Sequence, residues 1–259
     1  MNNTFLTEIS PIELVDGIYL KRNDKLNIYG LSGGKAQGAY NLIMKAKEQG
    51  KKGVVTLGAR HSPQCNIVGN LTNQENMECH LFMPVGPDTD TIINVSKLNN
   101  CTLHRINKGW TTQLIKEAKD FSLRYDYYLI PFGMKCNENI TLVSKQVTNI
   151  PNFIKRIVVP IGSGVTFCGV LKGVYDNNLD VEVVGVQTGA NSEEFIRKYN
   201  PFFRKINYKI ITYKPELKPK YRYTSFVDAS IGDIKLNPVY EAKCKEYLQP
   251  GDLFWIVGK

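Results

Sequence analysis

Two kinds of apolar pattern follow one another along this chain. Short runs rich in β-branched and aromatic residues, typical of buried strands, occupy residues 17–22, 53–58, 78–85, 127–131, 156–161 and 181–186. Segments with helical spacing lie between several of them, at residues 39–48, from residue 65 onward, at 91–95, at 111–125 and up to residue 172. Strands that alternate with helices predict an α/β fold with mostly parallel sheets, in which ligands bind at the carboxyl ends of the strands.

The composition is that of a globular protein. Its 259 residues suffice for one large domain or two small lobes, and 42% hydrophobic with 22% charged residues excludes a disordered chain. No apolar run is long enough to span a bilayer, and the first ten residues lack the basic and apolar regions of a signal peptide. We therefore expect a cytoplasmic protein.

The net charge of +9 permits a polyanionic partner such as nucleic acid. The lysines are spread along the chain, however, and no signature of a nucleic-acid-binding fold occurs, so charge alone supports that partner. The six cysteines are scattered without a CxxC pair, and nothing pairs His80 or His104 with a ligand set. Neither a metal site nor a redox motif is therefore expected, and the cysteines should be reduced and mostly buried.

The first candidate for chemistry is the turn Ser32-Gly33-Gly34-Lys35, which leads into the helical pattern at residues 39–48. Flexible glycines place the Lys35 amine at the start of a helix, on a backbone that can approach a ligand closely. Such a lysine can bind phosphate, although the full P-loop pattern is absent, or it can form a Schiff base with a carbonyl cofactor. The ordinary alternative is a solvated surface lysine.

The second candidate is the turn Gly162-Ser163-Gly164-Val165-Thr166, which follows the apolar strand at residues 156–161 and opens a helix. Backbone N–H groups and the helix dipole converge at such a turn, which suits a phosphate group. A tight strand-to-helix turn needs glycines in any case, so the motif gains weight only together with Lys35.

The chain resembles the fold-type II pyridoxal-phosphate-dependent enzymes, the group of tryptophan synthase β, threonine dehydratase, cysteine synthase and 1-aminocyclopropane-1-carboxylate deaminase. Four segments in the family's order carry the resemblance, which spans nearly the whole chain. They are the lysine segment at residues 35–41, the strand and loop at 53–64, the phosphate loop at 162–166 and the Tyr-Glu segment at 237–243. The last two resemble the deaminases most.

The resemblance implies how pyridoxal 5'-phosphate would be held. Lys35 would bind the cofactor as a Schiff base and move the proton at the substrate α-carbon. The turn from Gly162 to Thr166 would bind the phosphate through Gly162, Ser163, Gly164, Val165 and Thr166. Glu241 would face the pyridine nitrogen, where a carboxylate keeps that nitrogen protonated and strengthens the ring as an electron sink. Dehydratases and cysteine synthases have a hydroxyl at this position, so Glu241 favours deaminase-like chemistry.

The resemblance also implies the surroundings of the substrate. Ser62 matches the loop serine that contacts the substrate carboxylate, and Tyr240 would flank the substrate, so both are candidate catalytic residues. Gln64 and Tyr128 join Ser62 as candidate substrate-binding residues. Each has an ordinary alternative, since loops carry such side chains routinely and Tyr240 with Glu241 can simply begin a helix.

Two departures from the family pattern are visible. The family loop carries an asparagine that bonds the cofactor's phenolic oxygen, whereas this chain has Pro63, which has no donor, so His61 would substitute. The region between residues 189 and 237 is also shorter than in the family.

The expected architecture has two lobes, with residues 1–40 and 149–259 in a larger phosphate-binding lobe, residues 41–148 in a smaller lobe, and the cofactor in the cleft between them. The leading hypothesis is a pyridoxal-phosphate-dependent lyase or deaminase that acts on a small amino acid and releases ammonia and a 2-oxo acid. One alternative is a tailoring enzyme for an amino-acid-modified nucleic-acid base, and another is a non-catalytic cofactor-binding protein. A homodimer is the default assembly.

Overall fold

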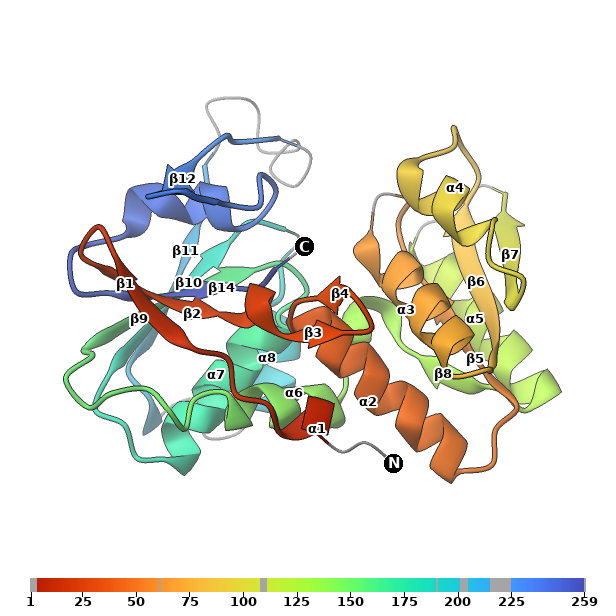
Figure 1. The fold of residues 1–259 in the computed structure, drawn as a ribbon, viewed down its shortest axis with the longest axis horizontal. Helices are drawn as coiled ribbons and strands as arrows, with labels where there is room; N and C mark the ends of the chain where they lie inside the picture. Colours follow the sequence, from red (N-terminus) through yellow and green to blue (C-terminus); the bar gives the residue numbers. More distant parts are fainter. Residues whose placement is uncertain are drawn as a thin grey trace. The chain divides into compact units, whose positions relative to one another are not determined.

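The computed structural model describes residues 4–60, 62–107, 111–189, 191–200, 205–214 and 225–258 (Figure 1). The chain forms two compact units. The larger contains Met1–Leu26, Ser32–Gly34 and Asn139–Lys259, and the smaller contains Asn27–Leu31 and Lys35–Glu138. Relative to the lobes expected from the sequence, residues 27–31, 35–40 and 139–148 belong to the other unit.

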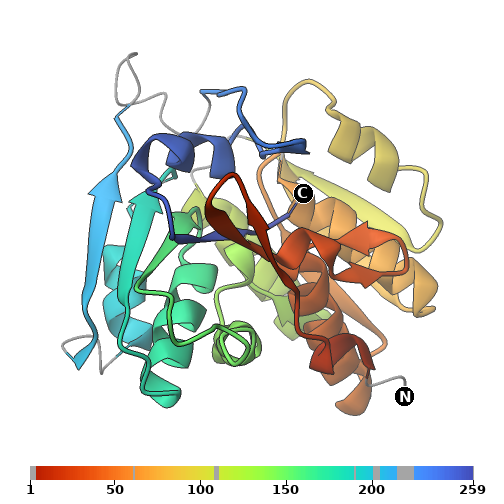
Figure 2. The ribbon, with the colours of Figure 1, turned by 60° about the vertical axis from the view of Figure 1, so that its left-hand side comes forward.

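The larger unit is built on a six-stranded sheet in the order β1-β2-β14-β9-β10-β11. The strands are β1 (Ile12–Val15), β2 (Ile18–Arg22), β9 (Arg156–Ile161), β10 (Glu182–Gln187), β11 (Tyr208–Thr212) and β14 (Leu253–Ile256). Neighbouring strands are parallel except β1 and β2, which pair antiparallel. Figure 2 shows β11 at one edge of this sheet. Strand β14, from the last part of the sequence, lies in the interior between β2 and β9.

Side chains alternate between the two faces of the sheet along each strand. Both faces are covered by other elements of the unit. One face packs against the helices α6 (Asn137–Lys145), α7 (Val165–Asp176) and α8 (Glu193–Tyr199), with Val159 and Ile161 in the shared core. The other face, with Val158 and Phe254, packs against β12 (Ser230–Ile231), β13 (Ile234–Lys235) and the 3-10 helix η5 (Glu241–Tyr247).

The smaller unit has a four-stranded, all-parallel sheet in the order β7-β6-β5-β8. Its strands are β5 (Gly53–Leu57), β6 (Glu78–Pro84), β7 (Cys101–Ile106) and β8 (Tyr128–Ile130). Its helices are α2 (Gly34–Glu48), α3 (Pro63–Gln74), α4 (Asp90–Val95) and α5 (Thr111–Tyr125). Helix α5 buries Leu114 and Ala118 against Val55 and Leu57 on one face of the sheet, and α3 packs on the other face.

Short elements complete the described chain. They are α1 (Thr4–Thr7), η1 (Asn23–Lys25), β3 (Asn27–Ile28), β4 (Leu31–Ser32) and η2 (Phe132–Met134). None of the helices in the described ranges has the length and apolar character needed to cross a bilayer.

The α/β class with parallel sheets and flanking helices is confirmed. The helix expected at residues 39–48 begins earlier, at Gly34, so Lys35 lies in its first turn rather than in the preceding loop. Small side chains at Ala36, Gly38 and Ala39, all buried, allow that turn to pack closely. Among the strands of the two main sheets, β1, β7, β11 and β14 were not expected from the apolar pattern.

Candidate active site

The turn between β9 and α7 has the geometry of an anion-binding loop. Gly164 caps the helix with φ at +95°, a left-handed conformation that favours glycine. No side chain of the described residues caps α7, so the first N–H groups of this 12-residue helix are left for another partner. A Cβ at Gly164 would also lie only 3.0 Å from Phe195 Cδ1. Ser163 and Thr166 flank this turn and are half-buried.

Tyr240 lies directly against this turn. A Cβ on Gly162 would lie 2.7 Å from Tyr240 Cε1, so the aromatic ring occupies the space that any side chain at residue 162 would need. Ser192 Oγ donates a hydrogen bond to the Gly162 carbonyl oxygen at 3.3 Å and supports the turn from behind. The structure thus brings together Tyr240 and the glycine turn, two features that the sequence analysis placed far apart in the chain.

Glu241 is the first residue of η5, and its side chain is buried. One of its two carboxyl oxygens accepts hydrogen bonds. Its Oε1 accepts hydrogen bonds from the backbone N–H groups of Val257 at 2.9 Å and Gly258 at 3.2 Å. Its Oε2 is buried and has no hydrogen-bond partner among the described residues. Burial raises the pKa of Glu241 to about 7, and the neighbouring backbone N–H groups offset this rise only in part. The carboxyl can therefore carry a proton or bind a cationic donor near neutral pH.

The backbone that precedes Lys35 rests on the same two residues that bind Glu241. Gly34 N donates to the Val257 carbonyl oxygen at 3.3 Å. Gly33, with φ at +99°, approaches so closely that a Cβ there would lie 2.9 Å from the Val257 carbonyl oxygen. Residues 257 and 258 therefore connect the Glu241 carboxyl to the Gly33-Gly34 pair, and Lys35 is the next residue along the chain.

In the smaller unit, Ser62 and Gln64 lie at the start of α3. Ser62 Oγ accepts a hydrogen bond from Gln64 N at 3.4 Å and so caps the helix. The Gln64 side chain is buried, and its Nε2 donates to Thr56 Oγ1 and to the Pro131 carbonyl oxygen, both at 2.9 Å. Its amide therefore ties α3 to the carboxyl ends of β5 and β8, while its expected contact with substrate stays a prediction.

Tyr128 is not brought together with Ser62 and Gln64. It begins β8 and lies opposite Val54, near the start of β5, whereas Ser62 follows the end of β5. Burial is the main reason that its pKa is raised, and the Lys45–Glu138 ion pair is close by. His61 lies outside the described residues. The roles expected for Tyr128 and His61 stay predictions.

Two further parts of this site support Glu241, and only one of them carries a sequence signal. Asn237 Oδ1 accepts from Val239 N at 2.9 Å and from Tyr240 N at 3.2 Å, which fixes the backbone before Glu241. Asn-Pro pairs often begin turns, so Asn237-Pro238 offered a local signal. Val257 and Gly258 act through their backbone, and no side-chain pattern marks them.

Other polar clusters contribute no further candidate. His80 Nδ1 lies 2.9 Å from His104 Nε2, and the His104 ring stacks on Phe82 with centroids 4.4 Å apart. Within the described ranges, no three His, Cys, Asp or Glu side chains gather in a way that could hold a metal ion.

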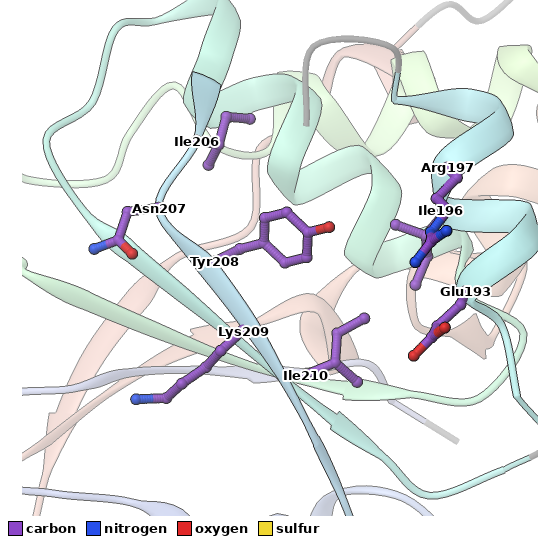
Figure 3. Close-up of a pocket in the computed structure, with 8 residues that line it drawn as sticks. All are labelled: Glu193, Ile196, Arg197, Ile206, Asn207, Tyr208, Lys209 and Ile210. Carbon is purple, nitrogen blue, oxygen red and sulfur yellow. The ribbon is translucent and has the colours of Figure 1, made fainter. Parts of the chain in front are cut away.

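A surface pocket of the larger unit lies between α8 and β11 (Figure 3) and contains none of the residues expected from the sequence. Its lining is Glu193, Ile196, Arg197, Ile206, Asn207, Tyr208, Lys209 and Ile210.

Comparison with known proteins gives a consistent picture. Residues 2–214 match the family model described as pyridoxal-phosphate dependent enzyme. A putative 1-aminocyclopropane-1-carboxylate deaminase of Thermotoga maritima is 26% identical over 261 residues, covering 87% of this chain and 81% of the relative. The bifunctional D-cysteine desulfhydrase/1-aminocyclopropane-1-carboxylate deaminase of Arabidopsis thaliana is 24% identical over 269 residues, covering 87% of this chain and 65% of the relative.

Solved structures agree on the fold. A homologue of 1-aminocyclopropane-1-carboxylate deaminase superposes with a TM-score of 0.79 at 20% identity, over 97% of this chain and 89% of that one. Threonine deaminase isoform 2 from Solanum lycopersicum gives 0.65 at 17% identity, over 96% and 83%.

Proposed function

Because the chain belongs to the pyridoxal-phosphate-dependent enzymes, we propose that it is a lyase or deaminase that acts on a small amino acid and releases ammonia and a 2-oxo acid. The buried Glu241 carboxyl carries this proposal, because its Oε2 has no partner among the described residues. The relatives from Thermotoga maritima and Arabidopsis thaliana have deaminase or desulfhydrase in their names, which supports the same class of reaction.

The residues present fit the cofactor at two points. Glu241 Oε2 is a buried acceptor that suits a protonated ring nitrogen, and such a cation would favour the charged carboxylate. The Gly162–Gly164 turn suits the phosphate, because the N–H groups at the start of α7 lack a capping side chain from the described residues. A Cβ at Gly162 would meet Tyr240, and one at Gly164 would meet Phe195, so glycine at both positions lets the turn keep this backbone path.

When bound, pyridoxal phosphate supplies an aldehyde that takes up the substrate amine and a ring that accepts the electron pair of a bond broken at the α-carbon. The Lys35 amine would hold the cofactor before substrate arrives and would afterwards move a proton at the substrate α-carbon. Glu241 would hold a negative charge at the ring nitrogen and so help the ring to accept that electron pair.

The remaining residues position the substrate. The Ser62 hydroxyl, which accepts from Gln64 N, can donate its own proton to a substrate carboxylate. Tyr240, fixed against Gly162, would flank the substrate and hold or release a proton through its phenol. Gln64 would act by fixing the start of α3, because its amide nitrogen is bound to Thr56 and Pro131. We propose a symmetric homodimer as the assembly, to be measured by light scattering.

The test is turnover by the purified protein with added pyridoxal phosphate. Candidate substrates are 1-aminocyclopropane-1-carboxylate, D- and L-cysteine, and D- and L-serine, with ammonia, the 2-oxo acid and, for cysteine, sulfide as measured products. Glu241→Gln should retain the cofactor but lower kcat on the order of a hundredfold, which corresponds to about 3 kcal/mol. Glu246→Gln, an exposed position on the same 3-10 helix, is the matched control and should leave kcat unchanged.

Three outcomes separate this function from its alternatives. Release of a 2-oxo acid from any of these amino acids supports the proposal. Cofactor uptake without turnover of any of them would contradict it and favour a cofactor-binding protein. Inhibition of turnover by duplex DNA, together with reaction of an amino-acid-modified base, would favour the tailoring enzyme.

A further inference from the structure

Two cysteines that are distant in the sequence lie directly opposite each other in the smaller unit. Cys79 begins the buried part of β6 and Cys101 begins β7, and the parallel register pairs their Cα atoms. Directly opposed residues on neighbouring strands point to the same face of a sheet, because side chains alternate along both strands together. This face is the one covered by α3, since Cys101 Sγ lies 3.1 Å from the Cβ position of Gly69 in that helix.

The register gives these cysteines a spacing that a disulfide can bridge. Neighbouring strands lie about 4.8 Å apart, and disulfides join Cα atoms about 4.4–6.8 Å apart. The two thiols are near enough for each to change the pKa of the other. Strand β7 lies at the edge of the sheet and is bonded to β6 alone, so it can shift slightly to complete a bond.

The two thiols differ in a way that gives each a separate role. Cys79 is fully buried, and burial raises its pKa, so it keeps its proton. Cys101 is half-buried, and the neighbouring Cys79 thiol lowers its pKa. Its thiol donates a hydrogen bond to Asn100 Oδ1 at 3.6 Å. Cys101 is therefore the more exposed of the two residues and the one expected to react first, and Cys79 is its fully buried neighbour.

We propose that Cys101 and Cys79 form an oxidisable dithiol that reacts with hydroperoxides. The Cys101 thiolate attacks one peroxide oxygen, the O–O bond breaks, and water or an alcohol leaves after taking a proton from solvent. The sulfur is oxidised by two electrons to a sulfenic acid. The Cys79 sulfur then gives up its proton and attacks Cys101, the S–O bond breaks, and water leaves, so a Cys79–Cys101 disulfide forms. A small thiol reductant returns both residues to thiols.

The other cysteines of the chain provide internal controls. Cys65 is buried in α3, and burial raises its pKa to about 12, so it should react slowly. Cys136 is half-buried like Cys101, but it lies in the loop after η2 and contacts the Met134 carbonyl oxygen rather than a second thiol. If exposure alone set the rate of reaction with peroxide, Cys136 would react as fast as Cys101. If the neighbouring thiol sets it, Cys101 should react faster than Cys136.

The experiment treats the full-length, cofactor-loaded protein with hydrogen peroxide, blocks remaining thiols by alkylation and maps the peptides without reduction. Combined cleavage after basic and after glutamate residues separates Cys65 (61–75), Cys79 (79–97) and Cys101 (98–105). The expected result is a cross-link between peptides 79–97 and 98–105 with loss of two hydrogen atoms, reversed by dithiothreitol. Cys79→Ser should instead leave Cys101 as a sulfenic acid that dimedone captures, and Cys101→Ser should abolish both products.

Two results would overturn the proposal. One is alkylation and peroxide reaction of Cys101 at the same rate as Cys136, with no cross-link. The other is a cross-link that joins Cys101 to Cys65. If Cys79→Ser fails to fold, the rates at Cys101 and Cys136 in the unaltered protein still decide the question.

Discussion

The ring of Tyr240 fills the space beside Gly162, so closely that a Cβ on residue 162 would lie 2.7 Å from Tyr240 Cε1. This contact joins the loop after β9 to Tyr240, the residue that precedes η5. Tyr240 is further fixed by Asn237 Oδ1, which accepts from its backbone N–H at 3.2 Å. A movement of the glycine turn at residues 162–164 therefore requires a movement of the Tyr240 side chain.

Gly162→Ala should weaken binding of pyridoxal phosphate about tenfold or more, or about 1.4 kcal/mol, because the added methyl group must displace the Tyr240 ring or the turn. Titration of cofactor absorbance with the purified protein measures the change. When Tyr240 is already replaced by alanine, Gly162→Ala should lower cofactor affinity much less than it does in the unaltered protein, because the ring that the methyl group would meet is absent. An equal loss in both backgrounds would show that the contact does not set the turn.

Lys35→Ala should abolish covalent fixation of the cofactor by borohydride, because it removes the amine that follows the anchored Gly33-Gly34 pair. After reduction and denaturation, the unaltered protein should keep cofactor absorbance on the peptide that contains Lys35. Lys47→Ala, an exposed position on the same helix, should behave as the unaltered protein does. Fixation that persists in Lys35→Ala would assign the cofactor to another lysine.

Glu241 should make the cofactor-free protein less stable as pH rises. Its pKa is about 7 in the folded state and 4.5 when unperturbed, so between these values the folded state binds more protons than the unfolded chain. The unfolding free energy therefore falls across this window, by up to about 3 kcal/mol at about 1.4 kcal/mol per pKa unit. Glu241→Gln should remove most of this slope in urea unfolding, measured by circular dichroism at both ends of the window.

Glu246→Gln is the control for that measurement, since Glu246 is exposed on the same 3-10 helix and should keep the full slope. A Glu241→Gln variant with the same pH dependence as the unaltered protein would mean that the carboxyl titrates normally. Its Oε2 would then be solvated, and its assignment to a ring nitrogen would lose its physical basis.

Lys21 should act in the opposite direction and at higher pH. Its ammonium is buried, with Nζ donating to the Ser10 carbonyl oxygen and to Asn149 Oδ1, both at 2.7 Å. Burial lowers its pKa from 10.5 to about 7, so the folded state binds fewer protons than the unfolded chain across that window. The unfolding free energy should therefore rise with pH there.

Lys21→Met should flatten this rise, and Lys116→Met, an exposed position on α5, should preserve it. Urea unfolding of both variants at the two ends of the window measures the difference. A rise that is unchanged in Lys21→Met would assign it to other groups.

Features carried by local patterns could be predicted well. The helix expected at residues 111–125 is confirmed with the same limits as α5, because its apolar residues recur at helical spacing and Leu114 and Ala118 pack on the sheet. The strand at residues 156–161 is confirmed as β9, and the glycine turn leads into α7 as expected. These elements depend on residues close together in sequence, where spacing and turn chemistry act directly.

Features that depend on strand register could not be predicted. Cys79 and Cys101 gave no motif, because only the parallel pairing of β6 with β7 brings them together. The support of Glu241 by Val257 and Gly258 was hidden for a similar reason, since backbone groups carry no sequence signal. The family resemblance makes Gln64 a candidate substrate ligand, and only its bonds to Thr56 and Pro131 reveal the fixed amide.

The interior position of β14 has a consequence for how the protein is made. Residues 253–256 lie between β2 and β9, so until they leave the ribosome the first two strands have no bonded connection to the β9–β10–β11 part of the sheet. Both flanking edges stay open during synthesis, and open edges are sites for wrong pairing between chains. Premature stops shortly before residue 253 should therefore give insoluble products rather than partly active enzyme.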